Sequence, residues 1–130
     1  MSKNRQQLVF NIKEDEQRRY VRGMQTEDRF FEAASVINSR TGEDDIPDCV
    51  LRIDRTSALE DMDGVDAVIY TTTCEIPVQI KSSLYGAQQF NRTHPDFVGI
   101  LIVIREEAEI QDIIDGIIGG VLKFIESSEE

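Results

Sequence analysis

Apolar side chains recur at helical spacing most clearly near the C-terminal end of the chain. The stripe consists of Ile110, Ile113, Ile114, Ile117, Ile118, Val121, Leu122 and Ile125. A stripe of this width has to be covered by a sheet or by a partner chain. The spacing therefore predicts a long helix, packed on the core or on a second copy in a homodimer formed through this C-terminal helix.

Three glycines lie on the other side of this predicted helix, at Gly116, Gly119 and Gly120. Each glycine inside a helix costs about 1 kcal/mol relative to alanine. Two explanations stay open: another backbone approaches this face closely, or the helix simply tolerates glycine.

Two other segments also have helical features. After Gly23, apolar residues keep helical spacing until the turn-forming stretch 40–42; they are Phe30, Ala33, Ala34 and Ile37. Residues 83–93 are typical of a further helix, which Pro95 ends.

Strands are predicted between and after these helices. Residues 49–53, 65–71 and 76–81 are short, β-branched and bounded by turn-forming or polar residues, and the last two form a predicted hairpin. The uninterrupted apolar run 97–104 predicts a strand buried on both faces. The expected order is helix, three strands, helix, strand, helix, which is an α/β domain.

The composition fits one domain of this kind. The chain has 130 residues, of which 40% are hydrophobic and 30% are charged. We expect an N-terminal arm over residues 1–22, a domain over 23–126 and an acidic tail over 127–130. No apolar stretch is long enough to span a bilayer and none forms the core of a signal peptide, so we expect a cytoplasmic protein without membrane contact. Two cysteines and one histidine do not support a zinc site or a disulfide framework.

The net charge of −11 argues against a protein that coats DNA by electrostatics alone. The charge is unevenly distributed, however. Residues 1–40 carry eight Lys and Arg against six Asp and Glu, whereas residues 41–104 carry four against eleven. Acidic residues near a metal site also count differently, because a divalent cation inverts the local field.

Candidate chemistry lies in the predicted hairpin. Asp66 enters its first strand, and Gln79 and Lys81 are two residues apart on its second strand, so they point to one face. Val78 and Ile80 then point into the core. We expect Asp66, Gln79 and Lys81 to cluster.

The pattern Asp-Gly-Val-Asp-Ala-Val-Ile followed by Val-Gln-Ile-Lys resembles the signature of the PD-(D/E)XK nuclease superfamily. It is most similar to the Gln-x-Lys variant of Mrr-type restriction endonucleases, and Holliday-junction resolvases are similar in size and element order. The resemblance covers about residues 24–104. It implies a restriction endonuclease-like core with a mixed central sheet, and a metal-dependent DNA endonuclease acting in restriction, repair or recombination.

The resemblance also implies roles for individual residues. The Asp66 carboxylate, the Gln79 side-chain carbonyl and the Ile80 backbone carbonyl would bind Mg²⁺ or Mn²⁺, which prefer oxygen ligands. Lys81 would orient the attacking water and offset developing charge. Gln79 replaces the acidic residue that is commoner in the family.

The family often adds a glutamate from the first helix, for which Glu27 and Glu32 compete. Glu27 borders the apolar face of that helix, whereas Glu32 points away from it. We therefore assign Glu27 to the catalytic set.

One face of the predicted helix 83–93 is polar, with Tyr85, Gln88, Gln89 and Arg92 at helical spacing. We predict DNA contacts for Arg92, Gln89 and Tyr85, since such a face can bind a phosphate backbone. The alternative for each of these side chains is an ordinary solvated helix surface.

The main rival is a catalytically inactive binding or regulatory module of the same fold. The negative charge and Gln79 favour it, whereas the joint presence of Asp66 and Lys81 favours the enzyme. A third hypothesis, an acidic mimic of nucleic acid, accounts for the charge but not for the hairpin.

Overall fold

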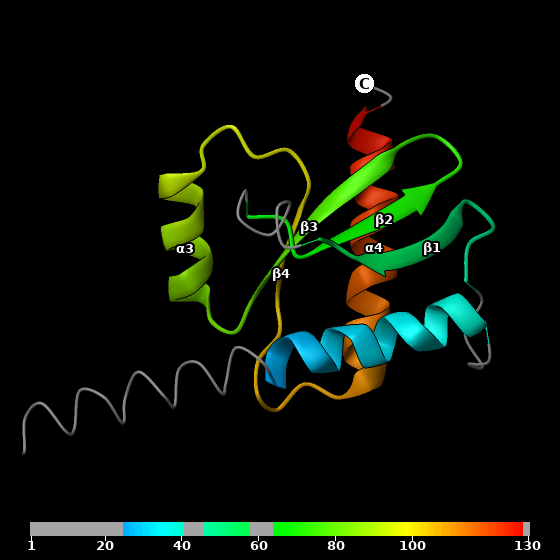
Figure 1. Cartoon of the computed structure of the whole chain (residues 1–130), viewed down its shortest axis with the longest axis horizontal. Helices are drawn as coiled ribbons and strands as arrows, with labels where there is room; N and C mark the ends of the chain where they lie inside the picture. Colours follow the sequence, from blue (N-terminus) through cyan, green and yellow to red (C-terminus); the bar gives the residue numbers. More distant parts are fainter. Residues whose placement is uncertain (1–24, 41–45, 58–63, 129–130) are drawn as a thin grey trace, which may run out of the picture.

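The computed structural model describes residues 25–40, 46–57 and 64–128, which form a four-stranded mixed sheet with helices around it (Figure 1). A helix over residues 25–39 comes first. The other elements are β1 (Val50–Arg55), β2 (Ala67–Thr71), β3 (Glu75–Lys81), α3 (Leu84–Thr93), β4 (Ile100–Val103) and α4 (Ile110–Ser128). The predicted α/β class and the predicted element order are confirmed.

The expected limits of the domain can be compared with the structure only at the C-terminal end. The predicted arm over residues 1–22 lies outside the described residues, and α4 continues through Ser128, into the segment expected as a tail. Within the described ranges, every helix is too short or too polar to cross a membrane.

The sheet has the strand order β1-β2-β3-β4. β1, β2 and β3 form an antiparallel meander, in which Ala67 pairs with Val78 and Ile69 with Ile76. The predicted hairpin is thus confirmed. β4 then pairs in parallel with β3 after the chain has passed through α3. β3 is therefore a central strand with one antiparallel and one parallel neighbour.

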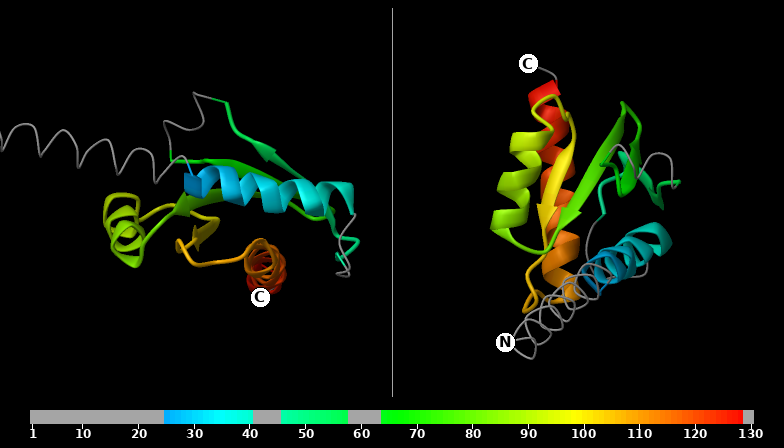
Figure 2. Two further views of the ribbon diagram at one scale, coloured as in Figure 1. Left: turned by 90° about the horizontal axis from the view of Figure 1, so that it is seen from below. Right: turned by 60° about the vertical axis from the view of Figure 1, so that its left-hand side comes forward.

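The core lies on one face of this sheet. Ile76, Val78 and Ile80 of β3 are buried there, as are the Ile113, Ile114, Ile117 and Val121 side chains of α4. Figure 2 shows α4 end-on, lying across one face of the sheet. The helix over residues 25–39 contributes its predicted apolar face to the same cluster, through Phe30, Ala33, Ala34 and Ile37. Both long amphipathic patterns were therefore interpreted correctly.

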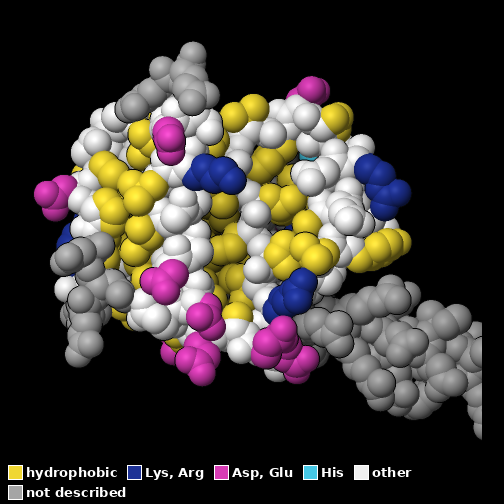
Figure 3. All heavy atoms as spheres, turned by 180° about the vertical axis from the view of Figure 1, so that it is seen from behind, with side chains coloured by type: hydrophobic (Ala, Val, Ile, Leu, Met, Phe, Trp, Pro, Cys, Tyr) yellow, Lys and Arg dark blue, Asp and Glu magenta, His cyan; other side chains and the backbone are white. Residues whose placement is uncertain are grey.

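β4 differs from the prediction. The strand is limited to Ile100–Val103, and all four of its residues are only half-buried, because β4 lies at the edge of the sheet. Val98, predicted to be buried within the strand, is 72% exposed. The run 97–104 was thus wrongly expected to be buried on both faces. Figure 3 shows apolar side chains reaching the surface on the side opposite to that of Figure 1.

Within the described ranges, no other backbone packs closely against the glycines of α4. A Cβ at Gly116 would contact the Ile102 side chain at 3.9 Å, and one at Gly120 would contact the Ile100 side chain at 3.5 Å. A Cβ at Gly119 would have no neighbour within 4 Å. Two of the glycines therefore face isoleucines of β4, and of the two explanations left open, the close approach of another backbone finds no support among the described residues. The homodimer through α4 stays a prediction, with Leu122 47% exposed on this helix.

Alanine substitutions at two glycines should have opposite effects on stability. Gly119→Ala should raise the free energy of unfolding by about 0.5–1 kcal/mol, because helical alanine loses less backbone entropy and the space is open. Gly99→Ala should lower it by about 1–3 kcal/mol, because its Cβ would lie 2.3 Å from the Pro77 carbonyl oxygen. Urea denaturation of both variants measures the difference, and equal effects would contradict this packing of Gly99 against β3.

Candidate active site

The backbone of Asp66 is hydrogen-bonded on both sides, to β3 and to the residue that follows β1. Its amide donates to the Val78 carbonyl at 2.8 Å, and its carbonyl accepts from the Thr56 amide at 3.3 Å. These bonds continue the sheet by one residue before β2 formally begins at Ala67. Asp66 therefore occupies a fixed position beside β3.

The Asp66 side chain bonds to β3 as well. One carboxylate oxygen, Oδ2, accepts from the Ile80 amide at 2.8 Å, and the residue is only 8% exposed. The carboxylate thus takes the place of a strand partner at a position that β2, which begins at Ala67, does not reach. This bond places the carboxylate against the peptide that links Gln79 to Ile80.

Gln79 is buried in an unusual way. It is 6% exposed, and its side-chain oxygen Oε1 has no hydrogen-bond partner anywhere in the described part of the chain. A buried acceptor left without a partner costs about 1–3 kcal/mol. Buried polar atoms in native proteins are normally paired with protein groups, ordered water or an ion. Ordered water or an ion is the usual partner of such a buried oxygen when the described residues supply none.

Lys81 and the turn before Asp66 meet at one aromatic ring. The Lys81 ammonium lies 5.5 Å from the centre of the Phe90 ring, on α3. Gly64 packs against the same ring: a Cβ at this glycine would lie 2.9 Å from Phe90 Cε2. Gly64 also has a φ of 85°, in the left-handed region that favours glycine. The Phe90 ring thus brings Lys81 and the chain leading to Asp66 to one side of the molecule.

Glu27 lies near the end of the sheet at which β1 ends and β2 begins. Its carboxylate is 3.8 Å from Nη1 of Arg55, the last residue of β1, and Arg55 pairs with Ala67. Glu27 therefore interacts with the guanidinium of a residue whose partner on β2, Ala67, follows Asp66 in the sequence. Glu32 is exposed on the same helix.

The three predicted DNA-binding residues share the exposed side of α3. Tyr85 is 64% exposed, Gln89 donates to its hydroxyl at 2.9 Å, and Arg92 is exposed in the last turn. The start of this helix adjoins Lys81, since a Cβ at Gly86 would lie 3.7 Å from Lys81 Cδ. The predicted contact face and the predicted catalytic lysine are thus neighbours.

The donors at this site are of mixed type. Over the described ranges, no three side chains of the His, Cys, Asp and Glu types come together as a metal-binding group. Asp66 is instead accompanied by an amide oxygen and by the peptide of Ile80.

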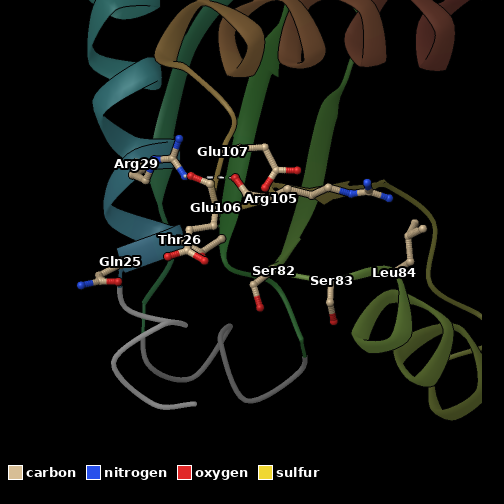
Figure 4. Close-up of a pocket in the computed structure, with 9 residues that line it drawn as sticks. All are labelled: Gln25, Thr26, Arg29, Ser82, Ser83, Leu84, Arg105, Glu106 and Glu107. Carbon is tan, nitrogen blue, oxygen red and sulfur yellow. Dashed lines mark hydrogen bonds between the residues drawn. The ribbon is translucent and has the colours of Figure 1, made fainter. Parts of the chain in front are cut away.

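A pocket of about 380 Å³ opens next to these residues, and sequence reasoning did not select it (Figure 4). It lies where the parallel strands β3 and β4 end, and it is lined by Gln25, Thr26, Arg29, Ser82, Ser83, Leu84, Arg105, Glu106 and Glu107. The carboxyl ends of neighbouring parallel strands are common ligand sites. The order of helix and strand after Lys81 was the signal that pointed to this location.

Comparison with known proteins gives no relative: no family model matches the chain, and neither a curated protein nor a solved structure matches it.

Replacing the unpartnered amide should stabilise the protein when no divalent cation is present. Gln79→Met keeps the length of the side chain and removes the buried acceptor, so the free energy of unfolding in EDTA should rise by about 1 kcal/mol. Gln88→Met, at an exposed position on α3, is the matched control and should change little. If Gln79→Met instead destabilises the protein by about 1 kcal/mol or more, its amide oxygen has a partner in the folded state.

Proposed function

We propose that the protein is a metal-dependent DNA endonuclease with a restriction endonuclease-like core. The observation that carries this proposal is the buried Gln79 amide oxygen, which lacks a partner among the described residues and belongs to the residue before Ile80, whose amide binds the Asp66 carboxylate. A structural role alone leaves the burial of this oxygen unexplained.

The topology supports the same proposal. An antiparallel meander of three strands is followed by a helix and by a strand parallel to the third. This is the order expected from the resemblance to the PD-(D/E)XK superfamily. The signature residues also occupy the expected elements, with Asp66 at the start of β2 and both Gln79 and Lys81 on β3.

The residues present fit a divalent cation. Asp66 and Gln79 would hold Mg²⁺ or Mn²⁺ with their side-chain oxygens, and Ile80 would add its backbone carbonyl. Such a cation polarises a phosphoryl oxygen and lowers the pKa of a bound water. Gln79 supplies an uncharged oxygen, so metal affinity is expected to be weaker than with a second carboxylate.

The other residues would act on the substrate directly. Lys81 would orient the attacking water and stabilise negative charge that develops on the phosphate. Lys81 is half-buried, and its ammonium group lies beside the Phe90 ring. Arg92, Gln89 and Tyr85 would hold the DNA backbone from α3, and Glu27 would assist from the edge of the site.

A second candidate function is a binding or regulatory module that has lost activity. The replacement of an acidic ligand by Gln79 and the net charge of −11 favour it. In that case the protein would bind a nucleic acid or a protein partner without cleaving it.

Cleavage of DNA is the direct test of the proposal. With Mn²⁺ or Mg²⁺, the purified protein should cut linear, branched or supercoiled DNA. Asp66→Asn and Lys81→Met should each lower the rate by about a hundredfold or more, since each such group contributes several kcal/mol to transition-state stabilisation. Asp66→Asn keeps an oxygen that can accept from the Ile80 amide, so the fold should persist.

Two further variants separate the candidate functions. Lys123→Ala, an exposed cation on α4, is the control and should cut at the wild-type rate. Gln79→Glu should tighten Mn²⁺ binding measured by calorimetry, because it restores a charged ligand. If neither wild type nor Gln79→Glu binds the metal or cuts any of these substrates, the inactive binding module takes the place of the enzyme.

A further inference from the structure

The pocket at the ends of β3 and β4 continues directly from the proposed catalytic lysine. Ser82, which lines it, follows Lys81 in the chain, and Arg105 enters it just after β4. Because Lys81 pairs with Val103 in the parallel register, the chain leaves β3 and β4 at the same end of the sheet. A strand of DNA whose phosphate lies at Lys81 would pass this pocket.

Arg105 supplies an available cation to the pocket. Arg105 is exposed, and within the described ranges its guanidinium has neither an ion pair nor a hydrogen bond. Glu106 and Glu107 also line the pocket, but neither makes an ion pair with Arg105. In Figure 4 the Arg105 side chain extends away from both glutamates, toward the start of α3. The guanidinium is therefore free to bind an anion.

The loop that carries Arg105 is held in place by a second arginine. Nη1 of Arg29, on the helix over residues 25–39, donates to the carbonyl oxygens of Arg105 and Glu106, each at 3.1 Å. The Ala108 amide closes a turn onto the Arg105 carbonyl at 3.1 Å. Arg29 is thus a positioning residue, which fixes the backbone from which Arg105 projects.

The opposite wall of the pocket is the first turn of α3. Ser83 caps this helix by accepting from the Gly86 amide at 3.1 Å, and no acidic residue lies in the first turn. For the Leu84 and Tyr85 amides, no acceptor occurs in the described part of the chain. Unpaired amides at the start of a helix carry partial positive charge and attract anions. Arg105 and these amides thus favour the same kind of ligand.

We propose that this pocket binds a backbone phosphate of the DNA strand, next to the phosphate that is cleaved. The assignment rests on the proposed nuclease function for the identity of the ligand. Arg105 donates to the phosphate oxygens, as planar guanidinium groups do in pairs of hydrogen bonds. Its role is to fix the strand relative to Lys81, and it takes no part in the bond cleavage.

Binding measured without metal tests the pocket independently of catalysis. In EDTA, inorganic phosphate and a short DNA duplex should both shift the backbone amide NMR signals of Ser83, Leu84 and Arg105. Arg105→Gln should weaken DNA binding about tenfold and reduce the dependence of log affinity on log salt concentration by about one unit. Arg105→Lys should recover part of the affinity, because it restores charge without the paired hydrogen bonds.

A charge-matched control makes the outcome decisive. Lys123→Gln removes one exposed cation from α4 and should leave the DNA affinity within about twofold of wild type. Wild-type affinity and salt dependence in Arg105→Gln, or the absence of DNA binding by the wild type, would overturn the assignment. Binding that depends on Arg105 in a protein that cuts no DNA would refute only the nuclease function. Cleavage that is insensitive to Arg105→Gln, with no phosphate-induced shifts, would refute only the pocket.

Discussion

The hydrogen bond from the Ile80 amide to the Asp66 carboxylate is the contact on which the candidate site depends. β3 is central, so its amides point alternately toward β2 and β4 and need partners in both directions, but β2 begins only at Ala67, opposite Val78, and does not reach Ile80. A carboxylate fills this position and is buried in doing so. The same bond that completes the sheet therefore fixes the Asp66 carboxylate against β3, the strand of Gln79 and Lys81, so the stability of the hairpin and the chemistry proposed for the site would be linked.

Much of the fold was predictable because each helix has one buried face. The stripe on α4 and the four apolar residues of the helix over 25–39 are all covered as their spacing requires, apart from the exposed Leu122. The hairpin was predictable for a related reason. Val78 and Ile80 alternate with Gln79 and Lys81, and a two-residue period fixes which side chains share a face. Residues 1–24 lie outside the described part, so the expected arm stays a prediction.

Other features depend on neighbours that the sequence does not specify. An apolar run such as 97–104 has the same pattern in a central strand and in an edge strand, and only the sheet order distinguishes them. Two glycines of α4 face isoleucines of β4, and the sequence pattern of the helix does not specify this contact. Alternation placed Gln79 on the polar face but did not reveal its burial, and the pocket beside Arg105 combines three segments that are distant in sequence.

The identity of residue 79 connects the site to the charge of the whole chain. With Asp66, Lys81 and a divalent cation, a neutral Gln79 leaves the site one charge more positive than an acidic residue would. In a chain of net charge −11, that extra charge would favour the approach of a phosphate under the proposed function, while a cation would be held by fewer charged ligands. Under the proposed function, weaker metal binding and stronger attraction for DNA would thus both follow from the identity of one residue. In the proposed phosphate pocket Arg105 would act in the same direction, because it adds a positive charge near the Lys81 end of β3 without competing for a cation.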